Sequence, residues 1–237
     1  MASTEKGALL ATEAGAKIGA FASSNFGGLW KFLFFVGAGC VTAGGVLGII
    51  GGISSFLSPF SFCNQVYLLI FGLLMLILDM PYENTQLHEI RLAIFRYLLF
   101  MTRFTGRGAW YLFLATMIWA SLFNLGLDPM IGFVLAAVVG ALGGVSVYFG
   151  VQKSMRLEKL RKAICAKGAN AVLDMVPARG LTLEEFNELA KQNVTDLTFS
   201  TEELHYISRA LSFRVRHDDI ISQEEFRSWT QGSMTIL

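Results

Sequence analysis

The stretch that decides the fold runs from Arg91 to Leu127 and reads RLAIFRYLLFMTRFTGRGAWYLFLATMIWASLFNLGL. Four arginines lie among apolar and aromatic residues in its first half, namely Arg91, Arg96, Arg103 and Arg107. The nineteen residues that follow, 109–127, carry no charge. Because about 20 apolar residues cover the hydrocarbon core of a bilayer, this change from basic to uncharged sequence indicates a membrane boundary.

The composition of the whole chain is that of an integral membrane protein. Its 237 residues are 54% hydrophobic and 16% charged, with a mean hydropathy of +0.53. Residues 1–151 hold seven Lys or Arg and six Asp or Glu, whereas residues 152–237 hold twelve of each. This contrast predicts two different solvents with a boundary near residue 152. The net charge of +1, without an unbalanced basic cluster, gives no reason to expect nucleic acid as a partner.

The apolar runs predict an all-α fold, a four-helix transmembrane bundle with an interfacial amphipathic helix and a C-terminal soluble helical domain. The expected spans are residues 32–57, 62–80, 109–127 and 130–151. Residues 1–29 precede them as an N-terminal cytosolic segment. Residues 30–151 therefore form the membrane domain, and residues 152–237 form the cytosolic helical domain.

Two of these spans carry small residues at four-residue intervals. The residues are Gly44, Gly48 and Gly52 in the first span and Gly132, Ala136, Gly140 and Gly144 in the fourth. Such a stripe leaves a groove into which another helix backbone can press. We therefore expect the first and fourth spans to pack closely against each other.

Residues 90–104 alternate apolar clusters with arginines at roughly helical spacing, which predicts an amphipathic helix in the headgroup plane. The alternative is that they form the first turns of a long third helix. Either arrangement places the four arginines beside lipid headgroups, where they are candidates for binding anionic lipid. The motif Gly106-Arg107-Gly108 then permits a bend at the membrane surface.

The second span ends in Asp79, which is a candidate functional carboxylate because ionisable groups deep in a bilayer are costly. The other interpretation places Asp79 at the interface, within reach of water or an arginine. The connections after the first and third spans carry no Lys or Arg, whereas twelve basic residues up to Lys162 lie on the opposite side. The positive-inside rule then predicts that both termini are cytosolic.

The C-terminal region contains three sequences typical of helix capping boxes. They pair Thr182 with Glu185, Ser200 with Glu203 and Ser222 with Glu225, and they predict helices over residues 183–192, 201–213 and 223–230. Residues 154–166 continue the fourth span as a basic amphipathic helix, in which Met155, Leu157, Leu160 and Ile164 form the apolar side.

The segments LTLEEF at 181–186 and ISQEEF at 221–226 each resemble the end of an EF-hand loop. With Glu185 at loop position 12, positions 1, 3 and 5 fall on Asp174, Val176 and Ala178. With Glu225 there, the same positions fall on Arg214, Arg216 and Asp218. Calcium needs oxygen ligands at these positions, so neither loop is expected to coordinate it normally. The two interpretations are a degenerate EF-hand pair and ordinary capped helices.

Signals for catalysis or metal binding are weak. The three cysteines and three histidines form no ligand cluster, and the chain lacks the nucleophile, zinc and phosphate-loop motifs of common enzymes. We therefore expect a protein that is not an enzyme, with no catalytic residue, no metal and no cofactor.

The membrane region resembles the COPI-associated family of Golgi-vesicle membrane proteins. The resemblance rests on the glycine-rich first span, the second span ending in Leu76-Ile77-Leu78-Asp79, and the stretch from Tyr97 to Leu114 around Gly106-Arg107-Gly108. It covers about residues 30–151 and leaves out the C-terminal region. It implies a tetraspanning protein of the endomembrane system, located in the Golgi or in other vesicles and involved in vesicle traffic.

Three functions remain open at this point. The first is a membrane adaptor or organiser whose arginines hold anionic lipid and whose C-terminal region binds a protein partner. The second is an accessory structural subunit of a larger membrane complex. The third is an oligomeric ion channel or transporter, which usually needs several polar groups inside the membrane.

Overall fold

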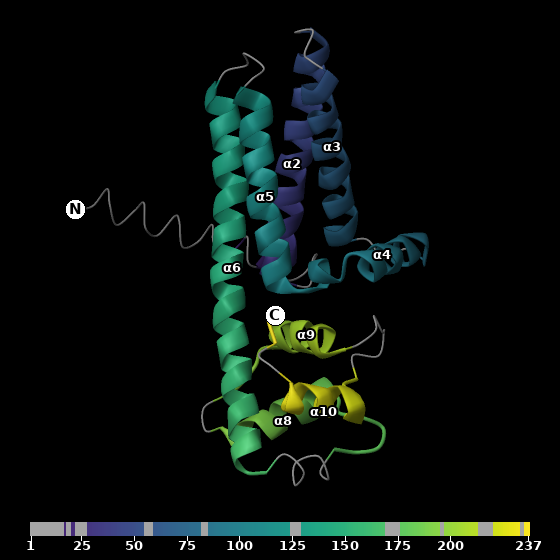
Figure 1. Ribbon diagram of the computed structural model, residues 1–237, viewed down its shortest axis with the longest axis vertical. Helices are drawn as coiled ribbons and strands as arrows, with labels where there is room; N and C mark the ends of the chain where they lie inside the picture. Colours follow the sequence, from purple (N-terminus) through teal and green to yellow (C-terminus); the bar gives the residue numbers. More distant parts are fainter. Residues whose placement is uncertain are drawn as a thin grey trace, which may run out of the picture. The chain divides into compact units, whose positions relative to one another are not determined.

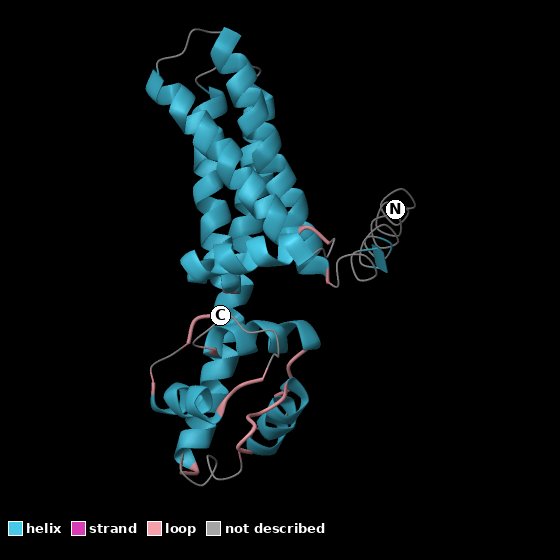
Figure 2. Ribbon diagram, turned by 90° about the vertical axis from the view of Figure 1, so that its right-hand side faces the viewer, coloured by secondary structure: helices cyan, strands magenta, loops and turns pink. Residues whose placement is uncertain are grey.

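The computed structural model describes residues 17, 20–21, 28–54, 59–81, 85–123, 129–168, 176–194, 197–212, 220–232 and 235–237. Within these residues the chain is helical, and Figure 2 draws only helices and loops. The β-type contact in this part of the chain is one isolated antiparallel bridge between Leu181 and Ile221. The all-helical fold is confirmed, whereas the predicted segment 1–29 lies almost wholly outside the described residues.

The helices keep the order expected from the sequence (Figure 1). Their bounds are α2 Leu29–Ser54, α3 Pro59–Asp79, α4 Thr85–Tyr97, the 3-10 helix η1 Leu99–Thr102, α5 Phe104–Phe123, α6 Pro129–Ala166, α8 Leu183–Asn193, α9 Thr201–Leu211 and α10 Gln223–Gln231. The three C-terminal helices agree with prediction to within two residues.

Three helices are long and apolar enough to cross a membrane, over Leu29–Ile53, Ser61–Asp79 and Met130–Ala166. They correspond to the first, second and fourth predicted spans. The third expected span lies in α5, which is not among the three. Its first turns contain Arg107, and residues 124–127 lie outside the described part of the chain. Four crossings therefore remain a prediction.

The single helix predicted over residues 90–104 is not found, because α4 ends at Tyr97 and the 3-10 helix η1 follows it, and the alternative of one long third helix is excluded as well. Between α4 and α5, Leu98 has φ −122° and ψ 60°, and Arg103 has extended φ −89° and ψ 140°. The chain therefore turns here, before the Gly-Arg-Gly motif. Residues 106–108 are helical within α5, so the bend expected at that motif is wrong.

The chain divides into two compact units. The first consists of Met1–Arg91 and Tyr111–Leu142, and the second of Leu92–Trp110 and Gly143–Leu237. Helices α5 and α6 each contribute to both units. The change in charge near residue 152 therefore falls inside the second unit.

In the first unit, α2 and α3 lie side by side (Figure 1) and their backbones come close. A Cβ added at Gly45 would lie 2.8 Å from the backbone nitrogen of Leu69, and one at Gly72 would lie 2.8 Å from that of Thr42. Only glycine allows this approach, as small residues do at membrane helix interfaces. Tyr111 of α5 stacks on Phe34 at 5.5 Å between ring centroids and donates a 2.7 Å hydrogen bond to the Phe34 carbonyl.

The predicted glycine stripes pack against other partners than expected. The nearest side chain to Gly44 is Ile118 of α5, and the nearest to Gly48 is Gln65 of α3. On α6, Gly132 faces Leu122 and Gly140 faces Ala115, both of α5, while Gly144 has no atom within 4 Å of an added Cβ. Helix α2 meets α6 instead at Gly37, which lies against Leu142. The glycine stripes of α2 and α6 therefore pack against α3 and α5, and they do not pack against each other.

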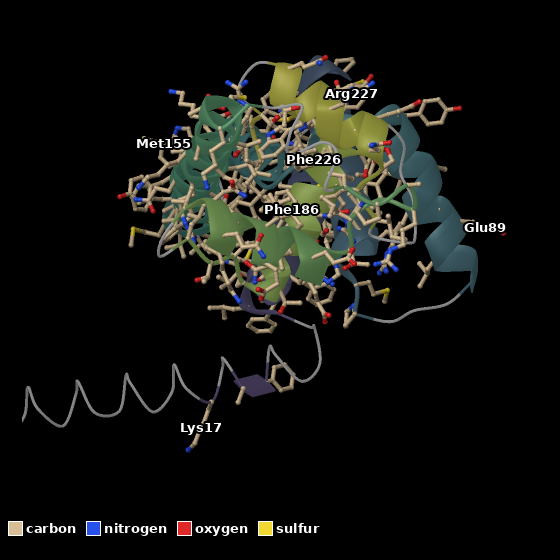
Figure 3. The ribbon with its side chains drawn as sticks, turned by 90° about the horizontal axis from the view of Figure 1, so that it is seen from below. Lys17, Glu89, Met155, Phe186, Phe226 and Arg227 are labelled. Carbon is tan, nitrogen blue, oxygen red and sulfur yellow. The ribbon has the colours of Figure 1, made fainter. Side chains whose placement is uncertain are left out.

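The second unit has its own hydrophobic core. Phe186, Phe226 and Trp229 form an aromatic cluster at its centre, with ring centroids 5.4 to 5.9 Å apart in the pairs that include Trp229, and Figure 3 labels both phenylalanines. The end of α6 adds Leu157, Leu160 and Ile164 to this core. Met155, expected on the same apolar side, is 61% exposed.

Candidate functional site

The Gly-Arg-Gly motif forms a tight packing point in the second unit. A Cβ added at Gly106 would lie 2.0 Å from the carbonyl oxygen of Phe100. One added at Gly108 would lie 2.4 Å from Ser146 Oγ and 2.9 Å from the backbone nitrogen of Val147. The two glycines therefore let η1 and α6 approach the first turns of α5.

Arg107 lies between these glycines and is only 4% exposed. Its Nε donates a 2.8 Å hydrogen bond to the carbonyl oxygen of Met101 in η1. A buried guanidinium that satisfies a backbone carbonyl is a structural group. The structure therefore does not favour the expectation that Arg107 binds lipid headgroups, because its side chain is almost fully buried.

Arg91 also binds backbone carbonyls, in this case at the end of α3. Its Nε donates to Ile77 over 2.9 Å, and its Nη2 donates to Met80. A cation at the C-terminus of a helix satisfies terminal carbonyls and complements the helix dipole. Asp79, in the same turn, is 4% exposed. The structure thus places this candidate carboxylate in a buried position at the helix end.

The two remaining candidates for binding lipid headgroups are Arg103 and Arg96. Arg103 is exposed, in the extended residue just before α5. Arg96 belongs to α4, but its side chain lies outside the described part of the structure. Arg103 is therefore the candidate that keeps a side chain open to a lipid headgroup.

A second cluster joins the chain's last residues to the start of α5 and to α6. Leu237 is 1% exposed, donates its N–H to Ser154 Oγ over 2.9 Å and accepts from the Thr105 N–H over 2.7 Å. The ring of Phe104 packs edge-on against Tyr206 at 5.1 Å. The C-terminal helices are thus fixed directly to η1 and α5 within one unit.

Lys153 contributes a cation to the same cluster. Its Nζ lies 4.5 Å from the ring centroid of Phe104 and 5.7 Å from that of Tyr206. A cation over aromatic rings is attracted by their negative faces. This cluster could not be predicted from the sequence, because the partners lie far apart in the chain and only the fold brings them together.

All three predicted capping boxes are present, each with both reciprocal hydrogen bonds. Backbone hydrogen bonding from Thr182 is the main cause that lowers the pKa of Glu185, and the Arg179 guanidinium adds to the effect. The carboxylate of Glu225 accepts from Ser222 N and Ser222 Oγ, both over 2.9 Å, and Glu225 is 1% exposed. Each box satisfies two backbone N–H groups at the start of its helix, those of the N-cap residue and of the glutamate three positions later.

The first unit also holds polar side chains inside its apolar helices. Asn64 Nδ2 donates to Ser121 Oγ over 3.0 Å and so joins α3 to α5. Next to it, Gln65 is 1% exposed, and its Oε1 has no hydrogen-bond partner in the described structure. Two adjacent amides inside a predicted span were the signal that could have revealed this pair.

Among the described residues, no group of three or more His, Cys, Asp or Glu side chains lies close enough to hold a metal ion. The described cysteines Cys40, Cys63 and Cys165 are free. The groups gathered at the Gly-Arg-Gly motif can pack, donate hydrogen bonds and present a cation.

The fold and these packing points define an all-helical membrane protein whose last apolar helix continues into a second helical unit. The sequence profile of the COPI associated protein family matches residues 29–167, which is more than half of the chain, and the chain belongs to this family. No curated protein and no solved structure matches the chain. The predicted resemblance is confirmed, and the match extends beyond residue 151 into the basic part of α6.

Family membership and the apolar helices together fit a membrane protein of the secretory pathway with a part in vesicle traffic. The matched region includes the Gly-Arg-Gly motif and Arg91. It ends at Lys167, one residue past α6, so α8, α9 and α10 lie outside it. The C-terminal helices are thus an addition to the matched region.

Proposed function

We propose that this protein is a non-enzymatic adaptor or organiser of secretory-pathway membranes, which crosses the bilayer four times with both termini in the cytosol. One observation carries the proposal: a COPI-associated membrane region continues without a break, through α6, into a unit with its own core. A helix of 38 residues is about 57 Å long at 1.5 Å per residue, well beyond the roughly 30 Å of the hydrocarbon core. Its last turns can therefore stand in the cytosol and support a binding domain.

The C-terminal unit is proposed to bind a protein partner through its exposed polar surface. Its core is filled by its own residues, and its outer face carries exposed charged side chains. These include Glu184, Glu188, Lys191, Glu224 and Arg227. Charged side chains of this kind suit the polar, solvent-accessible rim of a protein interface.

The membrane-facing part is proposed to bind anionic lipid through Arg103. A basic side chain near an anionic membrane surface contributes about 1 kcal/mol. Since Arg91 and Arg107 are used within the protein, the contribution of this site is smaller than four arginines would give.

The test of the adaptor role is affinity purification in mild detergent from cells that express the full chain or a surface variant. The variant reverses charge at Glu188 and Glu224, both exposed, and leaves the core intact. We expect the variant to lose co-purifying proteins while membrane insertion is unchanged. An identical set of partners for both proteins would contradict the proposal.

An accessory subunit of a larger membrane complex is the second candidate. Gly39 and Gly144 each have no atom within 4 Å of an added Cβ, and they leave open places on α2 and α6. Neighbouring subunits could fill them. A stable high-mass complex on native electrophoresis would favour this role over the adaptor role, and a monomer would count against it.

A further inference from the structure

The two segments of the C-terminal unit that precede α8 and α10 are joined like the loops of an EF-hand pair. The Leu181 N–H donates to the Ile221 carbonyl over 2.8 Å, and the Ile221 N–H donates to the Leu181 carbonyl over 2.9 Å. Each bridge residue lies four positions before the glutamate that would be position 12 of a calcium loop, Glu185 or Glu225. The bridge therefore falls at loop position 8 in both segments.

Gly180, just before the first bridge residue, is required by this arrangement. Its φ is +93°, a conformation that favours glycine, and an added Cβ would lie 2.7 Å from the Ile221 carbonyl oxygen. The pairing of the two segments is therefore specified by sequence.

The carboxylates at position 12, which would bind calcium through both oxygens, are engaged within their own helices. The Glu185 and Glu225 carboxylates accept hydrogen bonds from the N-caps of their own helices. Positions 3 and 5 of the first loop are Val176 and Ala178, which offer no side-chain oxygen. In a calcium-binding EF-hand, the carboxylate at position 12 binds the ion. In this protein the same carboxylates accept hydrogen bonds instead.

The apolar side of the pair is filled by the end of α6. Leu157, Leu160 and Ile164 are each at most 1% exposed and lie in one cluster with Phe186 and Phe226. Their spacing of three and four residues is that of an amphipathic helix whose apolar face lies in a groove.

Two arginines flank the same face and fix the position of α6. Arg156 pairs with Glu203 at 3.0 Å, next to the N-cap of α9. Arg161 donates to the Gly232 carbonyl over 2.6 Å, at the C-terminal end of α10. The second contact places a cation at a helix C-terminus, where it complements the dipole.

We infer that the C-terminal unit is an EF-hand-like pair that binds the end of α6 in its own chain and holds that helix without calcium. The inference is independent of the proposed adaptor role, because it concerns only what fills the groove. It implies that the attachment of this unit to α6 does not change with the calcium concentration.

The test is amide hydrogen exchange of the full chain in mild detergent, with chelator or with millimolar calcium. We expect the same exchange rates in α8, α9 and α10 under both conditions. Leu160→Asp places a charge in the apolar core, so exchange in α8 and α10 should rise by roughly a hundredfold. Met155→Asp, on the exposed side of α6, should leave these rates unchanged.

Amides of α2 and α3 serve as an internal reference for loss of the whole fold. Arg161→Gln is a milder variant that keeps the apolar face and removes a contact with the end of α10. We expect it to raise exchange in α10 by about tenfold. Slower exchange with calcium would overturn the calcium-free assignment. Unchanged exchange in both Leu160→Asp and Arg161→Gln would show that the unit does not bind α6.

Discussion

The N–H of Thr105 donates to the carbonyl oxygen of Leu237 over 2.7 Å, although the two residues are 132 positions apart in the chain. Thr105 lies in the first turn of α5, where backbone N–H groups lack partners within the helix. Leu237 supplies one such partner and buries its side chain at the same point. The C-terminal segment is thus part of the support of α5.

The first prediction concerns this contact. Leu237→Ala should destabilise the second unit by about 2–5 kcal/mol, because it removes a buried side chain from a packed core. Ile236→Ala is the matched control, since Ile236 is 49% exposed, and it should change stability by less than about 1 kcal/mol. Hydrogen exchange in α9, measured in detergent, would quantify both effects. Equal effects of the two substitutions would show that the segment is not held as described.

The second prediction separates two glycines that look alike in the sequence. Gly106→Ala should destabilise the protein by about 2 kcal/mol or more, because the new Cβ would lie 2.0 Å from a backbone oxygen that cannot move freely. Gly144→Ala meets no atom within 4 Å and should stabilise α6 by about 0.5–1 kcal/mol. Thermal unfolding in detergent measures both changes. A tolerated Gly106→Ala would contradict the close approach of η1 to α5.

The difference between these glycines illustrates what the sequence could predict. Apolar runs and capping boxes are local patterns, so they gave α2, α3, α6 and the three C-terminal helices within a few residues. The family resemblance was also visible, because Gly106-Arg107-Gly108 is a local motif.

The partners of each helix could not be predicted, because they depend on which faces meet in space. Gly48 and Gly140 lie on stripes that look equally suited to each other, yet they contact Gln65 and Ala115. From the sequence, Arg107 is expected to bind a lipid headgroup because it precedes an apolar run. In the fold, its side chain is buried and donates to the Met101 carbonyl oxygen. The distribution of charge along the chain predicts which side of the membrane a loop lies on. It does not reveal which basic side chains form hydrogen bonds inside the protein.

The third prediction tests the different roles of two arginines. Arg107→Ala should destabilise the fold by about 1–3 kcal/mol, since it leaves the Met101 carbonyl without its buried donor. Arg103→Ala should leave stability unchanged and weaken binding of anionic lipid by about fivefold, which corresponds to about 1 kcal/mol per surface charge. Thermal unfolding and native mass spectrometry with bound lipid would measure the two effects. The assignment is wrong if Arg107→Ala weakens lipid binding at unchanged stability.

The fourth prediction concerns pH. The folded state lowers the pKa of Glu185 below its ordinary value of 4.5, so the charged carboxylate stabilises the fold above that pH. This stabilisation is lost as the pH falls below about 4.5 toward the pKa of the folded state. Glu185→Gln keeps an acceptor for the capping box and removes the titration.

We therefore expect the variant to lose less stability than the natural protein as the pH falls below about 4.5, where the lowered pKa of Glu185 begins to cost the folded state its carboxylate. Hydrogen exchange in α8 at each pH gives the measurement. Glu188→Gln, on the exposed face of the same helix, is the control and should keep the natural pH dependence. The same pH dependence in both variants would rule out the role of Glu185.

The last prediction concerns Gln65, the buried amide on α3. Its Oε1 has no hydrogen-bond partner in the described structure, and an unsatisfied buried acceptor costs about 1–3 kcal/mol. Gln65→Leu has a similar size and no polar atom, so it should stabilise the first unit by an amount of that order. Asn64→Leu should instead destabilise it, because it removes the 3.0 Å hydrogen bond to Ser121. Thermal unfolding in detergent would measure the stabilisation by Gln65→Leu and the destabilisation by Asn64→Leu. If Gln65→Leu were destabilised, Oε1 would have to bind a group, such as an internal water, that supports the packing of α3 on α2.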